Sequence, residues 1–597
     1  MAENYYIGID VGTGSARAGL VKSDGTLVAS STQDTQTWRD HQDHRIFEQS
    51  TTDVWKGIAT AIRTVLSESK VSPKDVKGLG FDATCSLAVT DFDGEPISVT
   101  KGEPLGKKGE RNIILWADHR AEKEAELINS KHSVPLDFVG GTMSLEMEIP
   151  KVLWLKNNMS PSDFDKCQFF DLPDWLTYRA TGLPARSVCS LTCKCSYVPS
   201  KGGWQSEFLD RIGLQQLHEN GYKQLGATRT AHDAEAAQAG ETFGTQKEDV
   251  LTAGTPVGKG LSKKAAEELG LVEGTPVGSG VIDAYAGWLG TVAARHEENG
   301  KLSELVSFEE SGHRLAACAG TSTCHIVQSP EGVFVKGVWG PYKGPVFPGW
   351  WMNEGGQSST GQLIDFMITT HPAYPQLKEL AEQRKTNIHQ VLRDTLEEIR
   401  KAEGAESFTE VIKDIHFYPD LHGNRSPIAD PRMRGSMMGL ALDATLHDLA
   451  RKYAVTLEAI ALQTQHILTQ MNASGHSINS IYMSGSQAQN AFLMSLLANA
   501  CSVPVILPHS YSAAVVLGAA MLGRFAAEYA SGKKFKDEKE HCERLWGIMV
   551  AMTPKGSIVK PEASKKDRKI LDAKYKIFLE SIDIQKRWRK EMEDAAK

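Results

Sequence analysis

The sequence predicts an α/β protein of two lobes around a central cleft. Two stretches support this prediction, because each is an apolar strand that is interrupted by glycine and hydroxyl residues and then resumes: Ile7–Val21 (IGIDVGTGSARAGLV) and His313–Val327 (HRLAACAGTSTCHIV). Around the first of them, strand-like and helix-like segments alternate, as expected for helices that cover a mixed sheet. The shared pattern indicates two related lobes, each with a glycine-hydroxyl turn at the cleft.

Length, charge and hydropathy patterning set the broad class. At 597 residues the chain is too long for one hydrophobic core and predicts at least two domains. A net charge of -8 leaves no basic surplus to neutralise phosphates, which argues against a nucleic-acid partner. No apolar run reaches the roughly 18 residues of a membrane helix, and the start resembles no signal or transit peptide. We therefore expect a cytoplasmic protein without a membrane partner, for which a homodimer is one possible assembly.

The first hundred residues predict strands, a hairpin and a helix in turn. Ser23-Asp24-Gly25 is a hairpin signal, because Asp and Gly tolerate the positive φ that tight turns require. A second Asp-Gly turn follows a further strand at Asp93-Gly94. Apolar periodicity places strands at Tyr5–Asp10, Ala16–Lys22 and Thr26–Ser30 and a helix at Thr52–Ser67.

Composition shifts suggest the domain boundaries. The small-residue helix pattern before residue 290 runs into polar residues at Gly287–Glu298, so we expect a first lobe over residues 1–290 and a second over 291–545. The chain beyond about Lys533 is dense in charge and compatible with helix. It predicts a solvated C-terminal helical tail, which we place at residues 546–597.

Three cysteines lie close together in VCSLTCKCSY: Cys189, Cys193 and Cys195. The alternation of Leu191, Cys193, Cys195 and Tyr197 predicts a strand with buried thiols. A zinc site is the alternative, but the spacing matches no usual zinc motif and a fourth ligand would be required.

The first turn has the composition of an anion site. Glycines after a strand bring backbone N–H groups together, and the hydroxyls of Thr13 and Ser15 add donors. Asp10 could hold Mg²⁺, which takes only one or two carboxylates, and Arg17 could reach a phosphate oxygen. The alternative is a capped hairpin without a ligand. The segment lacks the Gly-Lys-Ser/Thr of a Walker A loop, and Arg17 replaces the third glycine of the dinucleotide motif.

Two later segments each place polar residues where a strand gives way to a helix. In GSGVIDAYAGWLG, Asp283 follows two apolar residues and could be a catalytic base, although an N-cap is the simpler interpretation. In IYMSGSQAQN, the small residues Ser484–Ser486 could let the backbone pass close to a planar base, and Asn490 could hydrogen-bond it. A routine strand-to-helix turn is the alternative for this second segment.

Eight segments between about Tyr6 and Gly523 occur in an order that resembles the FGGY family of carbohydrate kinases. They are DVGTGSAR, WADHRA, LPDWLTYRATG, VIDAYAG, AGTST, NEGGQSSTG, HGNRSP and MSGSQAQN. FDATCSLAV and NEGGQSSTGQLIDF are most similar to the ribulokinase branch, and Thr84–Leu87 is similar to the D-ribulose kinases. One departure is Ser486, which stands where the family usually has a second glycine.

The resemblance implies two actin/ribonuclease-H-like lobes, the first with the sugar site and the base, the second with the nucleotide site. It implies Mg²⁺ and ATP, with Asp283 as the general base and Asp10 on the metal side. The implied phosphate-binding residues are Gly12, Thr13, Gly14, Ser15, Arg17, Gly320, Thr321 and Ser322, and Gly485, Gln489 and Asn490 would border adenosine. The implied sugar-binding residues are Asp82, Thr84, Cys85, Ser86, Trp116, Asp118, Arg120, Lys194, Asp283 and Glu354.

We therefore expect an ATP-dependent kinase that converts a ketopentose, D-ribulose, to D-ribulose 5-phosphate. One alternative is a kinase for another pentulose or a pentitol, such as L-ribulose, xylulose or ribitol. Another is a non-catalytic regulator that uses the actin-like fold to bind a nucleotide, but intact Asp10, Asp283 and both turns favour an enzyme. Single residues keep structural alternatives: Lys194 a surface lysine, Glu354 a turn residue, Trp116 a core residue.

Overall fold

The sheet of the first lobe contains the predicted hairpin. This computed structural model describes residues 3–226, 250–532 and 537–597. Its first sheet has the order β12-β6-β1-β2-β3, in which β1 is antiparallel to β2 and parallel to β6. The strands are β1 (Tyr5–Val11), β2 (Ser15–Lys22), β3 (Leu27–Asp34), β6 (Val76–Ala83) and β12 (Val281–Ile282). The three predicted strands and the turn at Gly25 (φ 85°) are confirmed.

The predicted first helix is also confirmed, as α1 (Thr51–Ser69). Ser50 caps it by accepting a hydrogen bond from the Asp53 N–H, and the left-handed residue Lys70 ends it. Its buried face packs on the first sheet. Among the described residues up to 290, the other α-helices are α2 (Glu122–Asn129), α3 (Val134–Asp137), α4 (Glu148–Asn158), α5 (Pro161–Phe164), α6 (Leu172–Thr181), α7 (Val188–Cys193), α8 (Ser206–Ile212), α9 (Gln215–Glu219), α11 (Lys263–Leu269) and α12 (Asp283–Leu289).

A second five-stranded sheet widens the first lobe. Its order is β4-β5-β8-β7-β9, with all neighbours antiparallel. The strands are β4 (Trp38–Arg39), β5 (Phe47–Gln49), β7 (Leu87–Thr90), β8 (Ile113–Ile114) and β9 (Gln168–Asp171), and β10 (Arg186–Ser187) pairs with β11 (Val250–Leu251) nearby.

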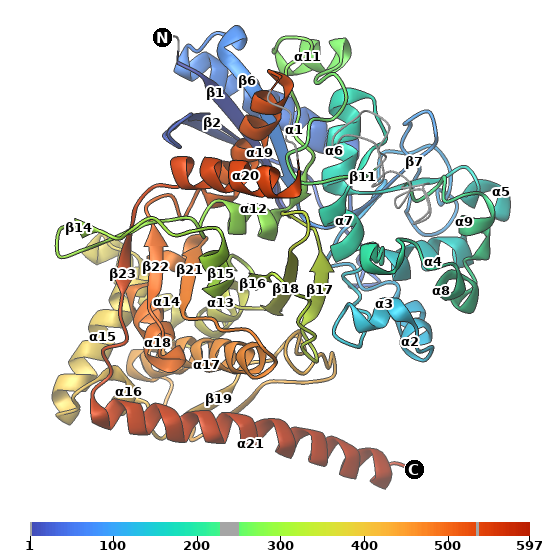
Figure 1. The fold of residues 1–597 in the computed structure, drawn as a ribbon. Coiled ribbons are helices and arrows are strands. Elements are labelled where there is room, and N and C mark those ends of the chain that lie inside the picture. The colour runs from blue at the N-terminus through green and yellow to red at the C-terminus, as the bar shows by residue number, and fades with distance from the viewer. Residues whose placement is uncertain (1–2, 227–249, 533–536) are drawn as a thin grey trace.

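The second lobe is built on a nine-stranded sheet of order β14-β13-β23-β22-β21-β15-β16-β18-β17 (Figure 1). Its central part repeats the first sheet, because β15 is antiparallel to β16 and parallel to β21. The strands are β13 (His296–Glu298), β14 (Lys301–Leu302), β15 (Arg314–Ala319), β16 (Thr323–Ser329), β17 (Trp339–Lys343), β18 (Trp351–Gln357), β21 (Ser480–Ser484), β22 (Val505–Pro508) and β23 (Gly556–Val559). A separate hairpin joins β19 (His416–Tyr418) and β20 (Ser436–Met438).

Helices around this sheet bury a second core, in which α17 is covered on nearly all sides. The helices after residue 290 are α13 (Gly361–Thr369), α14 (Tyr374–Arg384), α15 (Ile388–Glu403), α16 (Phe408–Val411), α17 (Leu446–Ala473), α18 (Ala491–Cys501), α19 (Ala514–Ala530), α20 (Glu538–Met552) and α21 (Lys565–Ala595). In the part of the chain that the structure describes, no helix combines the length and the apolar character that crossing a membrane requires.

Helix α19 packs on the sheet of the first lobe, although β22 before it and β23 after it pair with each other in the sheet of the second lobe (Figure 1). It lies directly on β1 and β6 because these strands carry glycines at the contact. A Cβ atom on Gly8 would lie 1.8 Å from the Val516 carbonyl oxygen, and one on Gly80 would lie 1.9 Å from that of Ala519. The close approach also brings the start of α19 next to α12, and so to the cleft.

Two sequence-based predictions are wrong. Cys189 and Cys193 lie on helix α7 rather than on a strand; both thiols are buried, as expected, whereas Cys195 is half-buried. A helix forms here with Ser187 as its N-cap, whose hydroxyl accepts from the Ser190 N–H, a local helix-start signal that outweighs the alternation. The tail is not simply a solvated helix, because β23 pairs with β22 and α20 buries an apolar face. Lys533, where the charged region was predicted to begin, is outside the described residues.

Candidate active site

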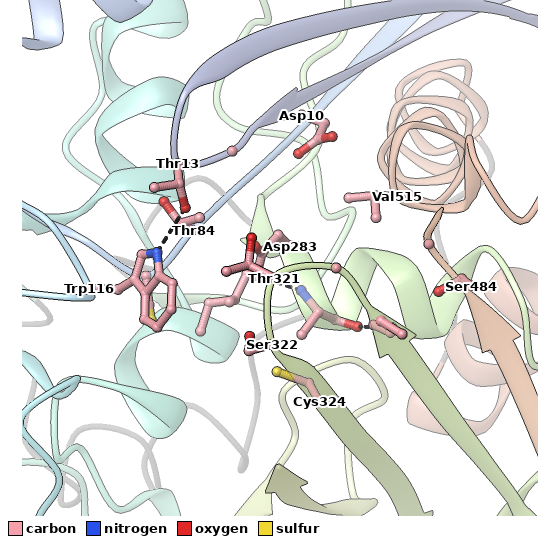
Figure 2. Close-up of a pocket in the computed structure, with 18 of the residues that line it drawn as sticks. Asp10, Thr13, Thr84, Trp116, Asp283, Thr321, Ser322, Cys324, Ser484 and Val515 are labelled. Atoms are coloured by element: carbon pink, nitrogen blue, oxygen red, sulfur yellow. Dashed lines mark hydrogen bonds between the residues drawn. The ribbon is translucent and has the colours of Figure 1, made fainter. Parts of the chain in front are cut away.

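A cavity of about 290 Å³ is lined by residues of both lobes (Figure 2). Asp10, Thr13 and Asp283 line it from the first lobe, and Thr321 and Ser322 from the second. The structure therefore brings together residues that are up to 505 positions apart in the chain, from Asp10 to Val515. The predicted site residues that line this cavity are Asp10, Gly12, Thr13, Arg17, Thr84, Cys85, Trp116, Lys194, Asp283, Gly320, Thr321, Ser322, Glu354 and Gly485.

The other predicted site residues lie outside the cavity lining. Asp118 and Arg120 form a buried ion pair with N–O distance 2.7 Å, and Arg120 also binds Glu48 at 2.9 Å. Asn490 caps α18 and donates to the Tyr453 hydroxyl at 2.8 Å. The remaining residues outside the lining are Gly14, Ser15, Asp82, Ser86 and Gln489.

The first glycine-hydroxyl turn is held by contacts within its own lobe and by one contact to the segment before α19. The Gly12 N–H donates to the Ser15 carbonyl at 2.9 Å, which closes the turn between β1 and β2. The Trp116 indole N–H donates to the Thr13 hydroxyl at 3.0 Å (Figure 2). The Arg17 guanidinium donates to the Ser30 hydroxyl at 3.0 Å and to the Ser512 carbonyl at 2.7 Å. Arg17 thus joins the turn to the segment that precedes α19.

The second turn is built in the same way from β15 and β16. The Gly320 N–H donates to the Ser322 carbonyl at 2.9 Å, and the Thr360 N–H donates to the Thr321 carbonyl at 3.0 Å. The Gln487 amide donates to the Gly320 carbonyl at 2.8 Å and so ties the loop after β21 to this turn. Gly485 is required beside it, because its φ is 89° and a Cβ would lie 2.1 Å from the Ala319 carbonyl oxygen.

Three carboxylates gather where neighbouring parallel strands end. Asp10 on β1 is the register partner of Asp82 on β6, and β12 beside β6 leads into Asp283. Asp82 is fully buried, whereas Asp10 and Asp283 are partly exposed. Burial raises the pKa of all three, and their mutual repulsion raises those of Asp82 and Asp283 further. The pKa of Asp283 is raised to about 7.

Asp283 is the first residue of α12 rather than its N-cap, so the N-cap interpretation is wrong. Ile282 occupies the cap position, and the Asp283 carboxylate accepts a hydrogen bond from the adjacent Ala284 N–H at 2.7 Å. Since this bond uses one carboxylate oxygen, the other is available to a molecule in the cavity.

Four further charges line the same cavity: Lys194, Glu354, Arg425 and Glu146. The Lys194 ammonium lies 3.3 Å from both Glu354 carboxylate oxygens, and Arg425 lies 2.9 Å from Glu354 and 3.3 Å from Glu146. Burial alone would lower the pKa of Lys194, but the negative charges around it, of which Glu354 contributes most, together outweigh burial and the pKa is raised. Lys194 is therefore a buried cation and not a surface lysine.

Comparison with known proteins identifies the family of this site. The model of the N-terminal domain of the FGGY family of carbohydrate kinases matches residues 5–218, and that of the C-terminal domain matches residues 315–527. A D-ribulokinase of Saccharomyces cerevisiae is 43% identical over 537 residues, which cover 88% of this chain and 72% of that protein. The chain belongs to the FGGY family of carbohydrate kinases. An FGGY carbohydrate kinase domain-containing protein of Homo sapiens is 39% identical over 597 residues, which cover 99% of this chain and 98% of the human protein.

Solved structures of sugar kinases share the fold. A xylulose kinase from Brucella ovis has a TM-score of 0.71 at 18% identity, over 98% of this chain and 100% of that one. This likeness confirms the predicted α/β class with two actin/ribonuclease-H-like lobes around a cleft.

The sequence-based prediction for this FGGY kinase missed several cavity-lining residues: Glu146, Cys318, Cys324, Arg425, Tyr511 and Ser512. Arg425 had a signal, because it stands in the HGNRSP segment that resembles the family. Glu146 had none, because a single Glu in a loop is indistinguishable from a solvated one until the fold places it beside Arg425 at 3.3 Å.

Proposed function

We propose that this FGGY kinase transfers the terminal phosphoryl group of ATP to the 5-hydroxyl of D-ribulose, with Asp283 as the general base. The observation that supports this most is the presence of Asp283 in one cavity with both glycine-hydroxyl turns. A reaction of this kind needs aligned reactants and cancellation of negative charge, and these elements are suited to both tasks.

The described residues fit a nucleotide with its metal. The two turns and Arg17 offer N–H, hydroxyl and guanidinium donors for the phosphates, and Gly485 borders the same cavity. Among the residues the structure describes, no cluster of three or more His, Cys, Asp or Glu could hold a metal alone. Asp10 is nevertheless suited to Mg²⁺, which keeps several waters and takes its remaining ligands from phosphates. When bound, Mg²⁺ supplies positive charge that neutralises the phosphates during transfer.

Asp283 has the properties of a base for a sugar hydroxyl. Its pKa of about 7 matches neutral pH, at which a base is both deprotonated in a large fraction of molecules and strong enough to accept a proton. In the proposed step the carboxylate takes the proton of the 5-hydroxyl while that oxygen bonds to phosphorus and ADP leaves. Closed lobes would exclude water as a competing acceptor.

The charges around the sugar favour a neutral polyol over a sugar acid. Lys194 and Arg425 are each within 3.3 Å of Glu354, so both cations already have an anionic partner. A substrate carboxylate would compete with Glu354, whereas hydroxyl groups can hydrogen-bond to both members of the pair. The identity of 43% to a D-ribulokinase supports a ketopentose among the neutral sugars.

The test is an ADP-release assay of the purified chain with Mg²⁺ and ATP over D-ribulose, L-ribulose, D-xylulose, ribitol and gluconate. We expect kcat/KM for D-ribulose to exceed each of the others by at least tenfold, since a hydroxyl of the wrong configuration leaves buried polar groups unpaired. A lead for another pentulose or for ribitol would replace the substrate but keep the kinase. ATP binding without phosphorylation of any sugar would favour the regulator.

A further inference from the structure

The four buried charges of the cavity come in equal number from the two lobes. Lys194 and Glu146 belong to the first lobe, and Glu354 and Arg425 belong to the second. Their side chains are at most 12% exposed, so they are removed from bulk water. We call these four residues the charge quartet.

Two of the three ion pairs in the charge quartet cross from one lobe to the other. Lys194 reaches Glu354 at 3.3 Å, and Arg425 reaches Glu146 at 3.3 Å. The third pair, Arg425 with Glu354 at 2.9 Å, lies within the second lobe. Each lobe therefore presents one cation and one anion to the opposite charges of its neighbour.

Each lobe holds its two charges as a unit. In the first lobe, the Glu148 N–H donates to the Lys194 carbonyl at 3.0 Å, which ties the Glu146 segment to the Lys194 segment. In the second lobe, Arg425 and Glu354 pair directly at 2.9 Å. Asn424 beside Arg425 donates to the buried Asp420 carboxylate at 2.8 Å, and Gln463 of α17 donates to the same carboxylate at 2.6 Å, which anchors the Arg425 segment. A relative movement of the lobes would therefore separate both crossing pairs together.

Contacts next to the charge quartet also cross between the lobes. The buried Trp339 ring of the second lobe lies 4.2 Å from the Lys194 ammonium and 4.2 Å from the Arg425 guanidinium. The Gly340 N–H donates to the Phe138 carbonyl at 2.9 Å, and the Gly337 N–H donates to the Gly140 carbonyl at 3.0 Å. These two amides report directly on whether the lobes are in contact here.

We infer that the charge quartet is an electrostatic clasp, which holds the two lobes together over the sugar site and releases them by hydration of its charges. Buried ion pairs suit a reversible contact, because their attraction is nearly balanced by the hydration that each ion regains when the pair separates. The alternating charges also favour a single register, since any shift would bring like charges together. Glu146 and Arg425 are then positioning residues, which hold Glu354 and Lys194 in place for the sugar.

The consequence for turnover rests on the proposed kinase function, because phosphoryl transfer needs the lobes closed around both substrates. The clasp itself does not rest on that function and can be measured without a substrate. The two claims can therefore fail separately.

The experiment is hydrogen–deuterium exchange on the full chain without ligands, comparing wild type with Glu146→Gln. Without the Glu146 charge, only one crossing ion pair remains. We therefore expect the Gly337 and Gly340 amides to exchange at least tenfold faster, which is roughly the effect of breaking one buried ion pair. Glu458→Gln is the matched control, because Glu458 and Lys574 form a buried ion pair inside the second lobe. It should leave both amides at the wild-type rate.

Wild-type exchange at both amides in Glu146→Gln would overturn the clasp. Glu146→Asp keeps the charge and should restore most of the protection, which a merely steric role would not predict.

With the substrate identified by the sugar panel, kcat should fall in Glu146→Gln. A rise in the sugar KM alone, with unchanged exchange, would instead make Glu146 a sugar ligand. Faster exchange in a protein that phosphorylates no sugar would refute the kinase and keep the clasp.

Discussion

The ends of β1 and β15 are built alike but carry different side chains. Asp10 on β1 pairs with Arg17 across the hairpin and with Asp82 on the parallel neighbour. At the corresponding positions of the second lobe, Cys318 on β15 pairs with Cys324 and with Ser484. Both strands then enter a glycine-hydroxyl turn that lines the same cavity.

Strand pairing therefore determines where each turn lies, whereas the residue at the strand end determines the chemistry beside the turn. In the first lobe the strand ends are charged, and burial together with Asp10 raises the pKa of Asp283 to about 7. In the second lobe the same positions carry thiols and a hydroxyl, and burial raises the pKa of Cys318 to about 12, so that it stays neutral. The first lobe is thus suited to a base and a metal, and the second to neutral contacts with a phosphate chain.

The strongest test of this asymmetry is Asp283→Asn. An amide of nearly the same shape cannot accept the hydroxyl proton, so we expect kcat to fall by roughly 10²–10⁴-fold while ATP affinity stays within threefold. Turnover by rapid quench and ATP affinity by calorimetry give the two quantities. Full activity in the variant would remove Asp283 as the base.

The next test compares the two strand ends directly. Asp10→Asn removes the carboxylate proposed for the metal side, and we expect kcat/KM to fall roughly 10²-fold, with a higher Mg²⁺ concentration at half-maximal rate. Cys318→Ser at the matching position of the second lobe keeps a neutral side chain and should change kcat/KM by less than about threefold. Equal losses in the two variants would contradict the division of chemistry between the lobes.

Much of this asymmetry could be predicted from the sequence, because it depends on local patterns. The hairpin at Gly25 and the strands before each turn follow from alternation and turn chemistry. The predicted roles of Asp10 and Asp283 depended on the resemblance to the family, because local chemistry alone favoured an N-cap at Asp283. The placement of Asp118 and Arg120 could not be predicted, because both are polar residues near the family's sugar segment and only the fold buries them against Glu48. Likewise, no local pattern brings Glu146 to Arg425, because they are 279 residues apart and their contact depends on how the lobes meet.

The pKa of Asp283 also predicts how activity and stability depend on pH. Since the base must be deprotonated, kcat/KM should rise with pH through about 7 and then level off. Stability should change in the opposite direction. The folded state keeps the Asp283 proton up to about pH 7, whereas the unfolded chain releases it near pH 4, so the stabilisation from this proton is lost between these values.

Asp283→Asn cannot release this proton, so its stability should fall less with pH in this window than that of wild type. At pH 8 we expect the variant to be more stable than wild type by roughly 1–3 kcal/mol. This is less than the full pKa shift of Asp283 would give, because the side chain is partly exposed to the cavity. Thermal melts of both proteins at pH 4 and pH 8 measure the difference, about 2–4 °C per kcal/mol for a large domain. The same difference in melting temperature between the two proteins at pH 4 and at pH 8 would show that the pKa is not raised.

The smallest expected effects come from the hydroxyls of the two turns. Thr13 is held by the Trp116 indole at 3.0 Å, whereas Thr321 is exposed and held only through its backbone carbonyl. Removing either hydroxyl, in Thr13→Ala or Thr321→Ala, should raise the KM for ATP about two- to tenfold, the range of one hydrogen bond. Because Thr13→Ala also leaves the Trp116 N–H without this acceptor, it should raise the KM for ATP more than Thr321→Ala.

If both turns bind one phosphate chain, the KM for ATP in the double variant should rise by less than the product of the two single increases, since a chain released from one turn is already displaced from the other. Strictly multiplicative losses would mean that the two turns bind independently.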